Sequence, residues 1–300
     1  VQRTGPSTGI PTKTEQADLG QALAGTHGDA PKVILAPTDV ADCFYCTTEA
    51  FYIAEKYQIP VLILSDQFVG QRKESIDRFD AARIRKAVRR LPTAEELRDY
   101  QRYVITPDGV SPMAITGTVG GEHMVCGLEH DERGVPTSTF EWHKKMSAKR
   151  ASKLDYIARE CGHVLTYGEP GAKLTVLAWG STKGVVKEAV EQLRAEGLSV
   201  SAVIPQLLFP LPLEKIMPFI QDTERLLVIE MSESGQFAHY LKGYYDLPVT
   251  PMVYVHGGPA LFTLSEITDA IRKAYGKKRT DRRRAPAAKA SSKEQEKVNS

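Results

Sequence analysis

Hydrophobic positions in the first part of the chain alternate between short apolar runs and stretches with helical spacing. A helix is predicted from about Thr12, because Thr12 and Glu15 have the spacing of a capping box and apolar residues follow them. Residues 31–36 and 61–65 are apolar runs typical of strands buried on both faces, and residues 39–57 have a helical pattern. This order predicts a parallel sheet with crossover helices.

A second and more regular series of elements begins at Lys173. Strands are predicted at residues 174–178, 200–204, 226–230 and 249–255. Helices are predicted at residues 185–196, 213–220, 235–244 and 264–275. Strands that alternate with helices in this way predict a compact, doubly wound α/β domain.

The stretch between the two series has no regular pattern until its end. Residues 70–103 are charged and contain proline, and residues 106–134 are rich in glycine, so both are predicted to be irregular. A helix is predicted at about 138–161. We therefore expect a first domain at residues 1–165 and a second at residues 172–275.

The composition fits a soluble globular protein, since 42% of the 300 residues are hydrophobic and 25% are charged. The net charge is +2, and much of the basic excess lies in residues 277–300, which are predicted to be a disordered tail. No stretch approaches the ~20 apolar residues of a membrane span, and no signal peptide is recognisable, so a cytoplasmic protein is predicted. Because the chain starts with Val1 rather than Met, we expect its earlier residues to be missing.

Four cysteines are too few for a disulfide-built fold, which favours a reducing compartment. Cys43 and Cys46 have the spacing of a redox pair or of half a metal site. They lie in a helical pattern, however, and no second pair completes four ligands, so structural cysteines are favoured. By itself this chain is not expected to hold a metal ion or a four-cysteine iron–sulfur cluster.

The segment from Arg3 to Thr12 has the most unusual composition, with one arginine, several hydroxyl side chains and two glycines between a predicted strand end and a predicted helix start. Ligands of open α/β sheets bind at strand ends, and a helix N-terminus attracts anions. An arginine there can also hold a carboxylate with two parallel hydrogen bonds. The segment is therefore either an anion pocket or a rigid connection that caps the following helix.

The sequence Arg3-x-Gly-Pro-Ser-Thr-Gly-x-Pro-Thr12, followed by Glu15-Gln16-x-Asp-Leu, resembles the α subunit of 2-oxoglutarate:ferredoxin oxidoreductases, in the 2-oxoacid:acceptor oxidoreductase family. Seven further stretches have the same resemblance, in order along the chain, at residues 61–67, 108–112, 127–134, 149–153, 179–184, 209–212 and 230–236. Each stretch alone is a weak signal, whereas the ordered series is specific and extends to about residue 275.

The resemblance implies an α/β fold with two parallel-sheet domains. The first, at residues 1–165, resembles an incomplete pyrimidine-binding domain of thiamine enzymes. The second, at residues 172–275, resembles the transketolase C-terminal domain, which mainly supports subunit packing.

The resemblance also implies an activity, namely reversible oxidative decarboxylation of 2-oxoglutarate to succinyl-CoA with electrons passed to ferredoxin. The implied cofactors are thiamine diphosphate and Mg²⁺, bound largely by a β subunit, and a [4Fe-4S] cluster in the partner subunit, with CoA as co-substrate. The implied partners are the β subunit, a second α copy and ferredoxin. No nucleic acid and no membrane is expected as a partner.

Candidate site residues follow from the same resemblance. Arg3 would pair with a substrate carboxylate and Thr12 would donate a hydrogen bond to it, while Ser7 and Thr8 either assist or cap. The loop at 127–134 is polar and bounded by glycine, so its residues Glu129, His130 and Asp131 either approach the active site or form a solvated turn. No catalytic residue is named, because the glutamate that activates thiamine in such enzymes is expected upstream of Val1.

Several alternatives stay open at this point. Pyruvate or a branched-chain 2-oxoacid could be the substrate instead of 2-oxoglutarate. The Gly-Pro-Ser-Thr-Gly motif favours 2-oxoglutarate. A lipoamide-linked 2-oxoacid dehydrogenase β-type subunit or a transketolase-like protein would share the architecture. A role in nucleic-acid binding through residues 277–284 is disfavoured because no aromatic side chains accompany the charges.

Overall fold

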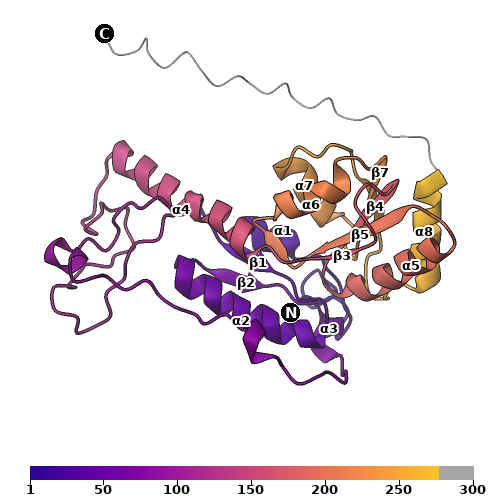
Figure 1. The fold of residues 1–300 in the computed structure, drawn as a ribbon, viewed down its shortest axis with the longest axis horizontal. Coiled ribbons are helices and arrows are strands. Elements are labelled where there is room, and N and C mark those ends of the chain that lie inside the picture. The colour runs from indigo at the N-terminus through magenta and orange to yellow at the C-terminus, as the bar shows by residue number, and fades with distance from the viewer. Residues whose placement is uncertain (277–300) are drawn as a thin grey trace, which may run out of the picture.

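The computed structural model describes residues 1–276, which form two β-sheets with helices packed on their faces (Figure 1). The first sheet has the strand order β2 (Val61–Ile63), β1 (Val33–Leu35), β6 (Leu207–Phe209). The second has the order β3 (Val164–Tyr167), β5 (Val200–Pro205), β4 (Leu174–Leu177), β7 (Arg225–Glu230), β8 (Met252–Val255). The predicted α/β fold class is confirmed. The tail predicted at residues 277–300 lies outside the described residues.

The helices bear out most of the predicted pattern. The longer ones are α2 (Val40–Tyr57), α4 (Phe140–Cys161), α5 (Lys183–Ala195), α6 (Leu213–Ile220), α7 (Gln236–Tyr244) and α8 (Leu264–Gly276). The short ones are α1 (Leu19–Ala24), α3 (Gln67–Gln71) and the 3₁₀ turns η1 (Ala81–Arg83), η2 (Glu96–Asp99) and η3 (Gly180–Thr182). Within residues 1–276, no helix combines the length and the apolar character needed to cross a membrane.

The second sheet is buried on both faces, which explains why its strands are continuous apolar runs. Along β7, Leu226 and Val228 contact the core shared with α6 and α7, whereas Leu227 and Ile229 contact the core shared with α5 and α8. This alternation follows from the two-residue period of a strand. The three strand pairs that join β5, β4, β7 and β8 are parallel, as predicted.

Each sheet also carries an antiparallel edge strand, which corrects the prediction of purely parallel sheets. Strand β3 pairs antiparallel with β5, and β6 pairs antiparallel with β1. Strand β6 follows β5 in the sequence but completes the first sheet. The side chain of Ile34 on β1 accordingly packs in the same core as residues of α6 and α7. The two series of elements therefore share one interior.

Strand β2, which pairs with β1, is less buried than the sequence predicts. Leu62 and Ile63 of β2 are 40% and 37% exposed. The apolar run at residues 61–65 was expected to be buried on both faces, and in this chain that expectation is wrong. The face of β1 that carries Val33 and Leu35 is covered by α2 and α4, because these two side chains pack against Ile53 and Ile157.

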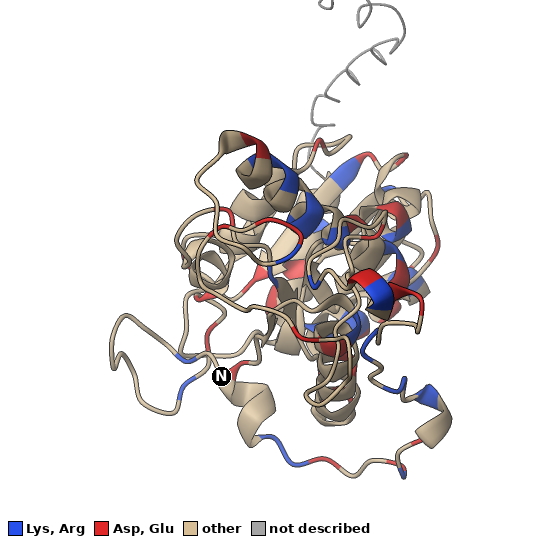
Figure 2. Ribbon diagram, turned by 90° about the vertical axis from the view of Figure 1, so that its left-hand side faces the viewer, with Lys and Arg blue, Asp and Glu red and all other residues tan. Residues whose placement is uncertain are grey.

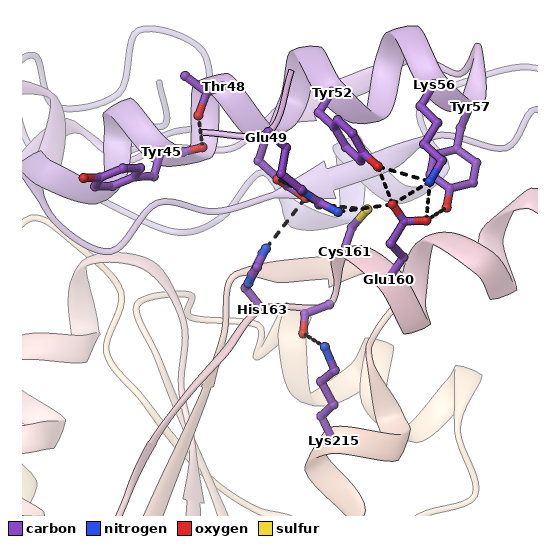
Figure 3. Close-up of polar contacts among 12 residues, drawn as sticks. Tyr45, Thr48, Glu49, Tyr52, Lys56, Tyr57, Glu160, Cys161, His163 and Lys215 are labelled. Carbon is purple, nitrogen blue, oxygen red and sulfur yellow. Dashed lines mark hydrogen bonds and ion pairs between the residues drawn. The ribbon is translucent and has the colours of Figure 1, made fainter. Parts of the chain in front are cut away.

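Helix α2 begins at an N-cap, because the side chain of Asp39 accepts a hydrogen bond from the backbone N–H of Asp42 at 2.8 Å. It is joined to α4 by a cluster of polar groups around Glu160 (Figure 3). The carboxylate of Glu160 accepts hydrogen bonds from Tyr52, Lys56 and Tyr57, with Lys56 Nζ at 2.6 Å. Burial alone would raise the pKa of Glu160, but these bonds lower it to about 2. The contact between α2 and α4 therefore includes a carboxylate that stays ionised at neutral pH.

The carboxyl group of Glu230 has a raised pKa, in contrast to that of Glu160. Glu230 ends β7, is 0% exposed, and accepts the backbone N–H groups of Phe237 and Ala238 at 2.8 and 3.0 Å. It thus caps α7 from the neighbouring strand end. Burial without a cation nonetheless outweighs the two hydrogen bonds and raises the pKa of Glu230 to about 7.

The pH dependence of stability should reflect this group. Between the ordinary pKa of a glutamate and about 7, the folded protein holds a proton that the unfolded chain has lost, so the unfolding free energy falls as pH rises. We expect the difference in unfolding free energy between wild type and Glu230→Gln to change by about 3 kcal/mol from pH 4.5 to 8. Urea unfolding at several pH values measures it. Glu214→Gln, at an exposed position, is the control, and parallel curves for wild type and Glu230→Gln would contradict the prediction.

Candidate functional site

The opening segment lies beside the chain that follows the carboxyl end of β2. The backbone N–H of Gln2 donates to Ser65 O at 2.7 Å, and the N–H of Gln67 donates to Gln2 O at 2.8 Å. Gln2 is therefore aligned parallel to the chain that leaves β2. The segment does not follow a strand of its own as predicted, because Gln2 forms only an isolated bridge with Asp66, but this bridge places it beside the end of β2, where ligands of parallel sheets commonly bind.

A closed loop follows. The backbone N–H of Thr4 donates to Lys13 O at 2.9 Å, and the hydroxyl of Thr4 donates to Thr14 O at 3.1 Å. Gly9 has φ +52°, and a Cβ there would lie 1.9 Å from Thr4 O, so only glycine fits. Ser7 and Thr12 also have positive φ, at 54° and 58°. Such angles cost energy for residues with a Cβ, especially a β-branched one, and are concentrated at functional sites.

The carboxylate of Glu15 holds this loop and does not form the capping box that the sequence predicts. One carboxylate oxygen of Glu15 accepts the N–H of Gly5 at 3.0 Å, and the other accepts the N–H of Gly258 at 3.2 Å. The first helix, α1, begins only at Leu19 and is six residues long. The prediction of a helix from Thr12 is therefore wrong, and so is the idea that its N-terminus offers N–H groups to a ligand.

Gln16 fastens the segment to the second sheet. Its side-chain amide donates to Trp179 O at 2.8 Å and accepts the N–H of Met231 at 3.0 Å, while its own N–H donates to Met231 O at 2.7 Å. The side chain is 0% exposed, and a Cβ on Gly180 would lie 2.7 Å from its amide nitrogen. The end of the loop is thus fixed between the ends of β4 and β7.

The four residues singled out in the sequence lie on this loop. Arg3 and Thr12 are adjacent to the Thr4–Lys13 pairing on its two sides, and Ser7 and Thr8 lie farther along the loop. All four are exposed. Within residues 1–276 the side chain of none of the four has a hydrogen-bond or ion-pair partner, so their donors are available to a ligand.

A cavity of about 260 Å³ opens beside Thr12. It is lined by Thr12, Lys13, Thr14, Gln67, Phe68, Gln71, Arg72, Pro259 and Leu261. Arg3 does not line it. Two cations, Lys13 and Arg72, line the same cavity as Thr12, and both were missed in the sequence. Lys13 is adjacent to the motif and could have been noticed, whereas nothing in the sequence connects Arg72 with it.

The second candidate loop has a local role in the structure. Glu129 accepts hydrogen bonds from Arg150 at 3.2 Å and contacts His143 Nδ1 at 2.6 Å, and these contacts, led by Arg150, lower the pKa of its carboxyl group. His130 packs on the ring of Tyr103 at 3.9 Å. Figure 1 draws this region at the far side of the molecule from the opening segment.

Asp131 closes the turn of the same loop. Its carboxylate accepts the N–H groups of Arg133 and Val135 at 2.9 and 3.0 Å. Within this chain, Glu129, His130 and Asp131 therefore have separate structural contacts, and the loop is not brought to the opening segment.

The cysteines do not gather into a site. Cys43 and Cys46 lie in α2, and burial raises the pKa of both thiols, that of Cys43 to about 11. These thiols stay protonated at neutral pH and are poor nucleophiles and ligands. In the described part of the chain, no three His, Cys, Asp or Glu residues are arranged to hold a metal ion.

Two protein families match the chain. Residues 1–149 match the family described as pyruvate flavodoxin/ferredoxin oxidoreductase, thiamine diphosphate-binding. Residues 172–265 match pyruvate:ferredoxin oxidoreductase core domain II. The two matches follow the two series of elements seen in the sequence.

Curated relatives and a solved structure agree with these families. The chain is 32% identical to 2-oxoacid:ferredoxin oxidoreductase 2 subunit alpha of Aeropyrum pernix, covering 90% of this chain and 42% of the relative. It is 35% identical to 2-oxoglutarate oxidoreductase subunit KorA of Mycobacterium tuberculosis, covering 91% and 41%. A structure of 2-oxoglutarate:ferredoxin oxidoreductase from Magnetococcus marinus, with 2-oxoglutarate, coenzyme A and succinyl-CoA bound, matches with a TM-score of 0.87 and 36% identity, covering 92% and 48%. The chain thus spans less than half the length of each of these proteins.

Removal of the Glu15 carboxylate should loosen the loop. In Glu15→Ala the N–H groups of Gly5 and Gly258 lose their acceptor, so we expect a loss of about 2 kcal/mol in unfolding free energy. Hydrogen exchange should accelerate in residues 4–14 and 257–261 and stay unchanged in β4 and β7. Glu169→Ala, at an exposed position, should alter neither quantity. Unchanged exchange in both loops of Glu15→Ala would show that the carboxylate does not hold them.

Proposed function

Since this chain belongs to the 2-oxoacid:ferredoxin oxidoreductase family, we propose that it acts within an α subunit that converts 2-oxoglutarate and CoA to succinyl-CoA and CO₂. The bond between C1 and C2 of the oxoacid breaks, and two electrons pass to ferredoxin. The observation that carries the proposal is the opening loop. It holds Arg3 and Thr12, without partners in residues 1–276, at the edge of a parallel strand pair.

The loop suits a carboxylate ligand. An arginine can donate two parallel hydrogen bonds to a carboxylate, and a nearby hydroxyl can add a third. The loop is held at Thr4, Glu15 and Gln16, so little conformational entropy is lost when a ligand binds. The strained backbone of Thr12 is maintained by these contacts and keeps its side chain on the exposed side of the loop.

The charge of the site favours a dicarboxylate over pyruvate. Arg3 lies on one side of the Thr4–Lys13 pairing, and Lys13 and Arg72 line the cavity on the other. Two carboxylates need two separate cationic contacts, whereas pyruvate needs one. Arg72 forms an ion pair with Glu74 at 3.3 Å, whereas Arg3 and Lys13 have no ion-pair partner within residues 1–276 and can supply the two contacts that 2-oxoglutarate needs.

The proposed cofactors and partners follow from the family. Thiamine diphosphate would supply the nucleophilic carbon that adds to the 2-oxo group. By the same family resemblance, its diphosphate and Mg²⁺ would be bound largely by a β subunit, which would also hold the [4Fe-4S] cluster. A second α copy and ferredoxin complete the proposed assembly. The role of this chain is to bind and orient the oxoacid.

Loss of the Arg3 guanidinium should weaken use of the substrate. In the full-length subunit assembled with its β partner, we expect Arg3→Ala to lower kcat/KM for 2-oxoglutarate roughly 100-fold, because a charge-assisted pair of hydrogen bonds is lost. The assay is CoA-dependent viologen reduction with 2-oxoglutarate and pyruvate in parallel. Arg3→Lys should recover only part of the activity, because it cannot form the bidentate contact.

Arg78→Ala, at an exposed and unpaired arginine in residues 1–276, is the matched control and should keep wild-type activity. Wild-type kinetics in Arg3→Ala would remove Arg3 from the site. Absence of reduction with every 2-oxoacid, from an assembled and cofactor-loaded protein, would disprove the proposed function.

Two substitutions of Thr12 distinguish the effect of its hydroxyl on activity from the effect of its positive φ. Thr12→Gly fits φ 58° without strain and removes the hydroxyl, so we expect kcat/KM to fall about tenfold while Tm stays within about 2 °C of wild type. Thr12→Ser keeps the hydroxyl and should remain close to wild type. Equal activity of Thr12→Gly and wild type would show that the hydroxyl does not contact the substrate.

A further inference from the structure

A second cavity, of about 200 Å³, lies between the end of α2, the segment at residues 102–111 and α4. It is lined by Gln58, Arg102, Tyr103, Gly109, Ser111, His130, Met146, Lys149, Arg150 and Lys153. Four of these side chains are basic and none is acidic. This composition is unusual for a partly enclosed space, because buried charges are normally paired.

Three of the cations have no carboxylate partner. Lys149 and Lys153 are four residues apart on α4, a spacing at which like charges repel. Arg102 is 8% exposed. Within residues 1–276 no ion pair involves any of these three side chains, whereas Arg150 is paired with Glu129.

The hydrogen bonds of these cations leave donors unused. Lys149 Nζ donates to Tyr103 O at 3.0 Å and to Ser111 Oγ at 2.5 Å. Lys153 Nζ donates to Gln58 O at 3.3 Å. An ammonium group has three donors, so Lys149 keeps one and Lys153 keeps two.

Arg102 gives the clearest sign of a missing acceptor. Its Nη2 donates to Gln58 Oε1 at 2.7 Å, but its Nε–H is buried and has no partner. A buried donor left unpaired costs free energy comparable to a lost hydrogen bond. Here the donor belongs to a charged group that lines the cavity, which calls for an acceptor inside it.

The carboxylates of Asp108 and Glu132 attract the two lysines electrostatically, but within residues 1–276 neither forms an ion pair with them. Asp108 accepts hydrogen bonds from Thr106 and from the N–H of Val110, and Glu132 accepts the N–H of Ile105. Burial, followed by the charge of neighbouring cations, lowers the pKa of Lys149 to about 7 and that of Lys153 to about 8. The attraction of Glu132 for Lys149 and of Asp108 for Lys153 therefore offsets the charge of the cluster only in part.

The excess of cations is local. Figure 2, which views the molecule from the left-hand side of Figure 1, shows Lys and Arg interspersed with Asp and Glu over most of the ribbon. A surface that is basic throughout would attract anions everywhere, whereas here the unpaired cations are gathered in one cavity.

We propose that this cavity binds the phosphate group of a small-molecule ligand. A phosphate monoester carries a charge of about −1.5 to −2 and three acceptor oxygens, which match three cations and their unused donors better than a single carboxylate does. The volume accommodates one such group with its neighbouring atoms. This inference does not depend on the substrate proposed for the opening loop.

The test is thermal unfolding and calorimetric titration of the full-length protein with inorganic phosphate, in phosphate-free, low-salt buffer at pH 7. Malonate, a dicarboxylate, is titrated at equal ionic strength. We expect phosphate to raise Tm in a saturable manner and malonate to do so at least tenfold less effectively. Lys153→Met, Lys149→Met and Arg102→Met should each weaken phosphate binding at least tenfold.

Lys144→Met is the matched control, because Lys144 is an exposed residue of the same helix that does not line the cavity. It should bind phosphate like wild type. Three variants are used so that a folding defect in one leaves two others to decide the outcome. Without phosphate, Lys153→Met should be at least as stable as wild type, because a like-charge repulsion is removed.

Three outcomes would overturn the proposal. The first is no saturable effect of phosphate on the wild type. The second is equal phosphate binding by wild type and the folded cavity variants. The third is preference for malonate, which would assign the cavity to a carboxylate, such as an acidic side chain of a partner subunit.

Discussion

The buried amide of Gln16 is the contact on which the arrangement of the molecule depends. It connects the segment that leaves the first sheet to the backbone at the ends of β4 and β7, at Trp179 and Met231. These two hydrogen bonds replace ones that water would otherwise supply, and in a buried place each lost partner is costly. With Gln16 in place, Glu15 reaches Gly258, and the loop that carries Arg3 and Thr12 has only one shape.

The regular elements could be predicted because each buries a recognisable apolar pattern. Strands β4, β5 and β7 lie between two layers of helices, so all their residues are buried and most are apolar, with Arg225 and Glu230 at the two ends of β7 as the charged exceptions. The short strands β3 and β6 were missed, because each has only three or four residues beside glycine or proline and depends on a distant partner. Their pairing is a tertiary property with no local signal.

The candidate site could be located from the sequence, but its supports could not. The residues of the opening segment have an unusual composition, which is a local property. Glu15 has the spacing of a helix cap, yet Gly5 and Gly258 offer it two better donors, and Gly258 is far away in the chain. Arg72 and Arg102 likewise acquire their surroundings only from the fold.

Strand β6 has a consequence for synthesis of the protein. The ribosome delivers β1 and β2 long before it delivers Leu207–Phe209, so one edge of β1 stays open while more than a hundred residues are added. An open strand edge next to exposed apolar side chains is where two unfinished chains pair wrongly. The sheet of β1 and β2 is therefore completed only after Leu207–Phe209 has been made, and the yield of folded protein is expected to depend on how quickly that strand follows.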